Sequence, residues 1–292
     1  IEIASLDSAA LARIDYTRGG ETVALKKSGD SWIYESDPAC PLDQTLVKQM
    51  VSVSTSLTAS RSFTSQDLAE YGLDQPACSI LLTDAGGGKK SFALGDRNEV
   101  TLEYYLTADG GDTVYLVDAA LYDAFDKGVL DLVQKEAVPN MDNATRLSIE
   151  RPDGALTLSL AKTADSSGGT GTDGENAAGP APVWYLEQPG AAPATLDAAK
   201  VTELLSELTQ LAFRKCVRYN AADIDLAEYG LDQPAATVTV TYPAVAAGTD
   251  SGSGGAEAQP GGASATFTLA LGDVFGEDYR CARLIGSKMV YL

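Results

Sequence analysis

The chemistry open to this chain is that of carboxylates, because the sequence contains 41 aspartates and glutamates and no histidine. Without histidine, neither a Ser-His-Asp triad nor a Cys-His pair can form, and zinc sites built on cysteine and histidine spacing are excluded. Two acids held in a cleft could still act as general acid and base. Candidates follow a Leu-Gly-Asp segment at two places: Glu99 and Glu103 at the first, and Asp273, Glu277 and Asp278 at the second. Loop acids are ordinarily solvated, and we interpret these as such.

Two further motifs resemble ligand-binding loops without completing them. The segment 96–99 (DRNE) resembles the start of a calcium loop, but it lacks the glycine at the sixth position and the glutamate at the twelfth. The segment 86–90 (GGGKK) is rich in glycine, but it lies in an expected hairpin turn rather than before a helix, so nucleotide binding is not expected. The sequence therefore indicates no catalytic, cofactor-binding or metal-binding residue.

The strongest candidate for a functional segment is an eleven-residue sequence that occurs twice. Residues 67–77 (DLAEYGLDQPA) recur without change as residues 225–235. Most of the segment has a structural explanation: a helical turn ending at a left-handed glycine, followed by an apolar contact and a proline that prevents the helix from resuming. Its polar side chains are not explained in this way, and we predict that they form a surface for interaction: Glu70, Asp74, Gln75, Glu228, Asp232 and Gln233.

The segments around these turns alternate in the manner of strands. Residues 13–18, 21–27 and 31–34 predict three short strands joined by tight turns. A helix with one apolar face is expected from 42 to 57, and a second apolar stripe at 201–211 repeats it. Four strands then follow the turn, at 77–83, 91–94, 103–108 and 113–117, before a last helix from 118 to 135. The predicted fold is α+β, with antiparallel sheets and an amphipathic helix on one face, in the order βββ-α-ββββ-α.

This order occurs twice, so the chain is predicted to be a tandem repeat of one module, at residues 1–140 and 141–292. The second module carries two insertions rich in glycine, serine and alanine, at 164–182 and 244–263, which we expect to be disordered hairpin tips. Its last expected strand is at 288–292, so the module is expected to lack the final helix. The chain begins at Ile1 and not at a methionine, so we expect that the complete protein has an additional N-terminal segment.

The composition of the chain excludes some classes of binding partner. The net charge of −20 repels phosphate backbones and anionic lipid, so nucleic acid is not expected as a partner. No stretch approaches 18 apolar residues, so direct insertion of this segment into a membrane is not expected either. The four cysteines could pair in three ways, but their positions do not correspond between the two modules, and buried free thiols are the preferred interpretation: Cys40, Cys78, Cys216 and Cys281.

The sequence resembles a bacterial family known as domain of unknown function 4340. The resemblance rests on Trp32, residues 41–43 (PLD), 71–76 (YGLDQP), 94–96 (LGD) and 114–117 (VYLV), and it recurs in the second copy at Trp184, 196–197, 229–234, 271–273 and 290–292. It carries no catalytic residue. It implies an extracytoplasmic protein of the cell envelope, anchored through an N-terminal membrane helix or lipid and in some cases accessory to a transporter.

Three functional hypotheses follow. The first is a non-enzymatic envelope module that binds another protein or a surface polymer. The second is a carboxylate-dependent enzyme such as a glycan hydrolase, which requires two acids about 5–10 Å apart in a cleft. The third is a solute-binding component of a transporter, which requires a deep, partly apolar pocket.

Overall fold

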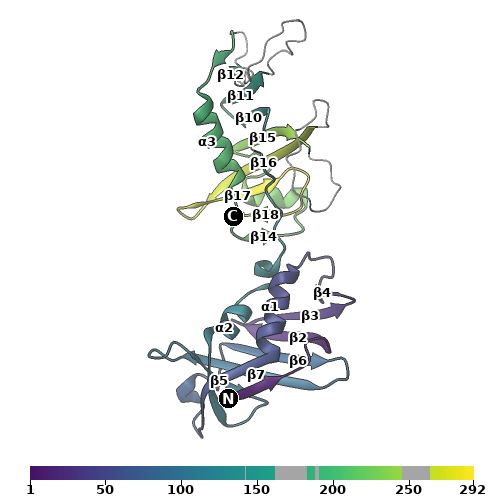
Figure 1. Cartoon of the computed structure of the whole chain (residues 1–292), viewed down its shortest axis with the longest axis vertical. Helices are drawn as coiled ribbons and strands as arrows, with labels where there is room; N and C mark the ends of the chain where they lie inside the picture. Colours follow the sequence, from purple (N-terminus) through teal and green to yellow (C-terminus); the bar gives the residue numbers. More distant parts are fainter. Residues whose placement is uncertain (142, 162–182, 188–190, 245–263) are drawn as a thin grey trace, which may run out of the picture. The chain divides into compact units, whose positions relative to one another are not determined.

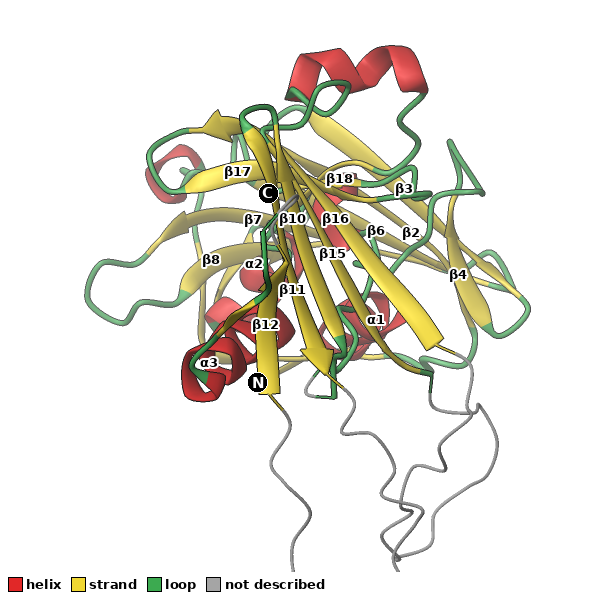
Figure 2. Cartoon of the chain, turned by 90° about the horizontal axis from the view of Figure 1, so that it is seen from above, coloured by secondary structure: helices red, strands yellow, loops and turns green. Residues whose placement is uncertain are grey.

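The computed structural model describes residues 1–141, 143–161, 183–187, 191–244 and 264–292. These residues form two compact units, Ile1–Lys135 and Glu136–Leu292 (Figure 1). Each unit is an antiparallel sheet accompanied by few helices, so the fold is α+β (Figure 2). The insertions predicted at 164–182 and 244–263 lie outside the described residues, apart from residue 244.

The first unit contains a nine-stranded antiparallel sheet in the order β1-β5-β9-β8-β7-β6-β2-β3-β4. The strands are β1 (Glu2–Ser5), β2 (Leu11–Arg18), β3 (Glu21–Ser28), β4 (Ser31–Tyr34), β5 (Ser56–Thr64), β6 (Cys78–Asp84), β7 (Lys89–Arg97), β8 (Tyr104–Ala108) and β9 (Thr113–Val117). The helices are α1 (Gln44–Thr55) and α2 (Ala119–Phe125), and the 3₁₀ turns are η1 (Ala69–Tyr71) and η2 (Val129–Leu132).

The second unit contains a sheet in the order β13-β12-β11-β10-β15-β16-β17-β18-β14. The strands are β10 (Arg146–Arg151), β11 (Gly154–Ala161), β12 (Val183–Glu187), β13 (Ala194–Thr195), β14 (Cys216–Arg218), β15 (Ala236–Pro243), β16 (Ser264–Phe275), β17 (Tyr279–Leu284) and β18 (Val290–Tyr291). The helix is α3 (Ala198–Thr209), and the 3₁₀ turn is η3 (Asp223–Tyr229).

The two sheets have the same strand order over eight positions. Reading from β4 in the first unit and from β12 in the second, the orders are β4-β3-β2-β6-β7-β8-β9-β5 and β12-β11-β10-β15-β16-β17-β18-β14. Each order is extended by one further strand, β1 in the first unit and β13 in the second. The duplication seen in the sequence is therefore a duplication of sheet topology.

Both repeated helices begin in the same way. The Asp43 carboxylate accepts hydrogen bonds from two backbone N–H groups at the start of α1, and the Asp197 carboxylate accepts one at the start of α3. The buried face of α1 includes Val47, Met50 and Val51, as the apolar stripe predicts. Among the described residues, none of the helices has both the length and the hydropathy needed to cross a bilayer.

The element order differs from the predicted βββ-α-ββββ-α. Strands β1, β5, β13 and β14 were not predicted, and β5 replaces the expected end of the first helix, which stops at Thr55. Leu57 lies in this strand, which pairs with β1 and β9. Its side chain and that of Ala59, two residues later on the same face, are both buried. The last helix of the first unit is also shorter than expected. It begins after Asp118 as predicted but ends at Phe125, and η2 follows Gly128.

All four cysteines are buried and none of them is in a disulfide, which confirms the interpretation of their spacing. Cys78, at the start of β6, is fully shielded from solvent. Its burial raises the pKa of the thiol from 9.0 to about 12, and the nearby Asp126 carboxylate adds to the shift while Arg18 opposes it.

This shift predicts how Cys78 affects stability at alkaline pH. Below the pKa of the unfolded thiol, the group is protonated in both states and contributes its full stability. As the pH rises toward 12, the unfolded chain loses the proton while the folded chain retains it, so stability falls. We expect Cys78→Ala to flatten this fall in urea-unfolding measurements between about pH 8 and 11. Ile80→Val, which changes a buried neighbour on β6 without removing a titratable group, serves as the control. An equal slope in the wild type and Cys78→Ala would contradict the prediction.

Candidate functional site

The repeated eleven-residue segment forms the same turn in both units. In the first unit η1 ends at Gly72, which has a φ of 67°, and the Leu73 N–H donates to the Leu68 carbonyl. In the second unit η3 ends at Gly230, with a φ of 63°, and the Leu231 N–H donates to the Leu226 carbonyl. The predicted helical turn with a left-handed glycine is therefore confirmed in both copies.

Each turn lies directly against a strand that carries the Leu-Gly-Asp segment. A Cβ atom on Gly95 of β7 would lie 2.1 Å from the Tyr71 carbonyl oxygen, and one on Gly272 of β16 would lie 2.1 Å from the Tyr229 carbonyl oxygen. A side chain at either position would therefore collide with backbone. The aspartate that follows each strand glycine completes the contact, since a Cβ on Gly72 would lie 2.6 Å from the Asp96 carboxylate. The repeated turn and the Leu-Gly-Asp segment, although distant in the sequence, are therefore in direct contact.

Apolar and aromatic side chains anchor the turn on the sheet. Leu73 is 6% exposed. The Tyr71 ring packs edge-on against Phe63 of β5, at a centroid distance of 5.2 Å, and in a tilted arrangement against Tyr105 of β8, at 4.8 Å. Partial burial raises the pKa of Tyr71, and the Glu70 carboxylate raises it further.

The second turn is anchored by a comparable cluster. Its buried members are Ala221, Leu226, Leu231, Ala270 and Val290, with Val217 and Tyr229 packed against them. Both turns are thus fixed to their sheets by apolar contacts.

The polar residues predicted to form an interaction surface all lie on the outside of these turns. Glu70, Asp74 and Gln75 are exposed in the first unit, and so are Glu228, Asp232 and Gln233 in the second. The structure thus presents each identical set of three polar side chains on a turn of identical type.

The first turn borders a pocket of about 580 Å³, which we call the acidic pocket. Its lining includes Glu70 from the turn, Asp96 and Arg97 from the end of β7, Glu99 from the connection between β7 and β8, and Tyr105 from β8. The structure therefore brings Glu70 and Glu99, two residues singled out in the sequence for different reasons, to one site.

The connection that lines the acidic pocket is ordered by Asn98. Its amide oxygen accepts hydrogen bonds from the N–H groups of Val100 and Thr101, at 2.9 and 3.0 Å, and its amide nitrogen donates to the Tyr105 hydroxyl at 2.7 Å. The Asn98 oxygen, which a calcium loop would offer to the ion, is therefore engaged by the backbone. The remaining loop acids named in the sequence are exposed, except for Glu103, which is half-buried.

Exposed apolar side chains beside both turns were not foreseen. Val100 is 90% exposed and Leu102 51%, in the connection after β7. Val274 and Phe275, at the corresponding end of β16, are 56% and 57% exposed. The signal in the sequence is that apolar residues continue past the Leu-Gly-Asp segment, where a solvated turn would favour polar ones.

The chain matches a known protein family twice along its length. Residues 32–180 and 184–292 each match the family model described as Domain of unknown function (DUF4340). The chain belongs to this family. The two DUF4340 matches begin at Trp32 and Trp184, the buried tryptophans of β4 and β12, and each includes one copy of the turn. Comparison with curated proteins and with solved structures finds no match.

Proposed function

We propose that this chain is a non-enzymatic module of the cell envelope that binds a protein partner through its two repeated turns. The observation that carries the proposal is that each turn has one set of residues packed on the sheet and a second, polar set exposed to solvent. Its glycine, leucine and tyrosine fix it to the sheet. Its three polar side chains are identical in the two units and exposed in both. Those side chains face solvent rather than the sheet, which supports a role in recognition.

The surroundings of the turns favour a partner segment with basic and apolar side chains. In the first unit the acidic pocket places Glu70 and Glu99 beside the exposed Val100. A turn that is already fixed loses little conformational freedom on binding. The net charge of −20 increases the rate of encounter with a basic partner, most strongly at low salt.

The envelope location is part of the same proposal. It is supported by membership of the DUF4340 family, because resemblance to that family implies an anchored envelope protein that is in some cases accessory to a transporter. A protein that binds a neighbouring envelope component at its turns is consistent with an accessory role beside a transporter.

The test begins by identifying the partner through photo-crosslinking in cells, with the crosslinker placed at Gln75 or Gln233. Affinity for the purified partner is then measured for one double variant per turn, Glu70→Gln with Asp74→Asn and Glu228→Gln with Asp232→Asn. We expect each to weaken binding about tenfold, because two exposed ion pairs are each worth up to about 1 kcal/mol.

The matched control is Asp30→Asn with Asp153→Asn, which removes the same charge from two exposed residues outside the turns. We expect this control to bind the partner as the wild type does. Equal weakening by the control would show a general effect of charge. Unchanged binding in both turn variants would exclude the turns as the binding surface.

A further inference from the structure

The hairpin that joins β7 to β8 presents large apolar side chains to solvent. Its tip, residues 98–103, which we call the first tip, borders the acidic pocket and exposes Val100 (90%) and Leu102 (51%). Nine large apolar side chains are exposed among the described residues, and four of them lie at this hairpin or at its counterpart between β16 and β17. Single exposed apolar residues need no explanation, but their concentration at one position of the repeated fold does.

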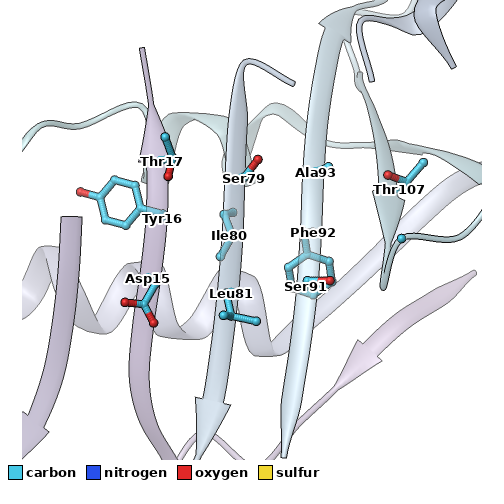
Figure 3. A pocket seen from close by; sticks show the side chains of 11 residues that line it. Asp15, Tyr16, Thr17, Ser79, Ile80, Leu81, Ser91, Phe92, Ala93 and Thr107 are labelled. Carbon is cyan, nitrogen blue, oxygen red and sulfur yellow. The ribbon is translucent and has the colours of Figure 1, made fainter. Parts of the chain in front are cut away.

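The open face of the same sheet provides a contrast. One row of small or hydroxyl-bearing side chains crosses β2, β6, β7 and β8 (Figure 3): Thr17, Ser79, Ala93 and Thr107. None of the exposed large apolar side chains in the described part of the chain lies on these four strands. The apolar exposure is therefore a property of the tip and not of the sheet.

The first tip is held in one conformation by hydrogen bonds of its own. Besides the bonds to the Asn98 side chain, the Asn98 carbonyl accepts from the Leu102 N–H, and the Asn98 N–H donates to the Glu103 carbonyl, both at 2.8 Å. Arg97 Nε donates to the Leu102 carbonyl at 3.2 Å. A surface fixed in this way loses little conformational freedom when a partner binds.

Leu102 is in a conformation that does not favour leucine. Its φ is 62°, in the left-handed region where glycine is free of strain and a side chain is not. About half of the side chain is exposed, so burial within the fold gives little in return. Contact with a partner would account for an apolar side chain at this position.

The electrostatic surroundings indicate the kind of partner. Glu99 and Glu103 flank the apolar residues in the sequence, and the acidic pocket adds Glu70 and Asp96. Arg97 is the basic residue among those that line the pocket. This balance favours a surface that combines apolar and basic side chains. A second copy of the chain, with a net charge of −20, is repelled, and so is anionic lipid.

The backbone of the first tip is closed to an extended peptide. The N–H groups of residues 98 and 100–103 all donate hydrogen bonds within the tip, and β7 and β8 are each paired on both sides. An extended segment that covered the apolar side chains would therefore leave its own backbone groups without partners. An α-helix pairs its backbone groups internally, so it can cover the tip without that cost.

We propose that the first tip and the acidic pocket together bind a basic amphipathic helix of a protein partner. The apolar face of the helix covers Val100 and Leu102. Its lysine or arginine side chains lie against Glu70, Glu99 and Glu103. This inference deepens the proposed function and rests on it in one respect, that this part of the first unit binds protein.

The experiment uses two synthetic peptides of the same composition and charge. In LKKLLKLLKKLLKL the leucines have helical spacing, and in LKLKLKLLKLKLKL they have the spacing of a strand. Binding of each labelled peptide to the full chain is followed by fluorescence anisotropy. The chain carries Val274→Ser and Phe275→Ser, so that the hairpin of the second unit does not compete. We expect the helical peptide to bind about tenfold more tightly than its isomer.

The tip variant is Val100→Ser with Leu102→Asn, which leaves the charge unchanged and places at 102 a residue that tolerates a positive φ. We expect it to weaken binding of the helical peptide about tenfold or more, because two apolar anchors are lost, without lowering the melting temperature. Ile285→Ser, which removes another exposed apolar side chain (59%), is the matched control and should bind as the wild type does.

The charge of the tip is tested separately with Glu99→Gln and Glu103→Gln combined. We expect binding of the helical peptide to weaken about fivefold, since exposed ion pairs contribute modestly. The difference from the wild type should shrink as salt is added, because salt screens exposed charges.

Equal binding of the two peptides overturns the proposal, since attraction between charges alone would then explain the contact. Unchanged binding in the tip variant overturns it as well. Two further measurements address other occupants: flotation with vesicles of phosphatidylcholine and phosphatidylglycerol, and sedimentation of the chain alone. Vesicle binding or dimerisation that is lost in the tip variant would assign the tip to a membrane or to a second copy.

The outcome is separable from that of the turn variants, whose effect is measured with the crosslinked partner. If the turn variants lose that partner while the tip variant still binds the helical peptide, this inference fails and the proposed function holds. If the tip variant loses the peptide while the turn variants keep their partner, the turns are excluded and the helix-binding tip is supported.

Discussion

Replacing Gly95 with alanine is expected to lower the free energy of unfolding of the first unit by about 3 kcal/mol. The added methyl group would lie 2.1 Å from the Tyr71 carbonyl oxygen. Because the obstructing atom belongs to the backbone, no change of side-chain rotamer can relieve the collision. The whole turn would have to move away from β7, and Leu73 and Tyr71 would lose their packing on the sheet.

The measurement is urea unfolding followed by Trp32 fluorescence in a Trp184→Phe background, which isolates the signal of the first unit. Gly86→Ala is the control, because a Cβ there meets a flexible side chain, that of Asp84, at 3.2 Å. Gly272→Ala should destabilise the second unit by a similar amount, in the reciprocal Trp32→Phe background. A loss below about 1 kcal/mol for Gly95→Ala would mean that the turn is not held against the strand as described.

Replacing Phe125 with alanine is expected to cost about 3–5 kcal/mol, the range for removing a buried aromatic ring. Phe125 is completely buried, and its ring meets Tyr16 edge-on at 5.3 Å. Its loss leaves a cavity between α2 and the sheet. It also loosens the segment after α2, whose Lys127 carbonyl accepts a hydrogen bond from the Tyr16 hydroxyl at 2.7 Å.

Phe275→Ala is the matched control, because this phenylalanine is 57% exposed. Its replacement should change stability by less than about 0.5 kcal/mol. Thermal unfolding of both variants by circular dichroism gives the comparison. Similar losses for the two substitutions would contradict the assignment of Phe125 to the core.

The parts of the fold that could be predicted are those encoded by neighbouring residues. Strand β9 falls at 113–117 as its alternation predicts, and α1 begins at Gln44, within two residues of the predicted start at 42. The turn was predictable because one glycine, the following leucine and the proline specify it locally.

The parts that escaped prediction depend on pairing between distant segments. β5 follows α1 directly and without a glycine or proline to mark the change, so its start at Ser56 depends on pairing with β1 and β9. The same holds for the site. The sequence identified Glu70 and Glu99 separately, and only the packing of the turn on the sheet shows that they border one pocket.

The way each turn is fixed has a consequence for how such a module can be altered. The contact between turn and strand uses two glycines, a carbonyl oxygen and a buried leucine, while positions 70, 74 and 75 face solvent. Exposed substitutions remote from such contacts change stability little, so the three positions can be randomised as a short recognition loop on a constant scaffold. Because the chain carries two such loops, one can be given a new specificity while the other retains the original one.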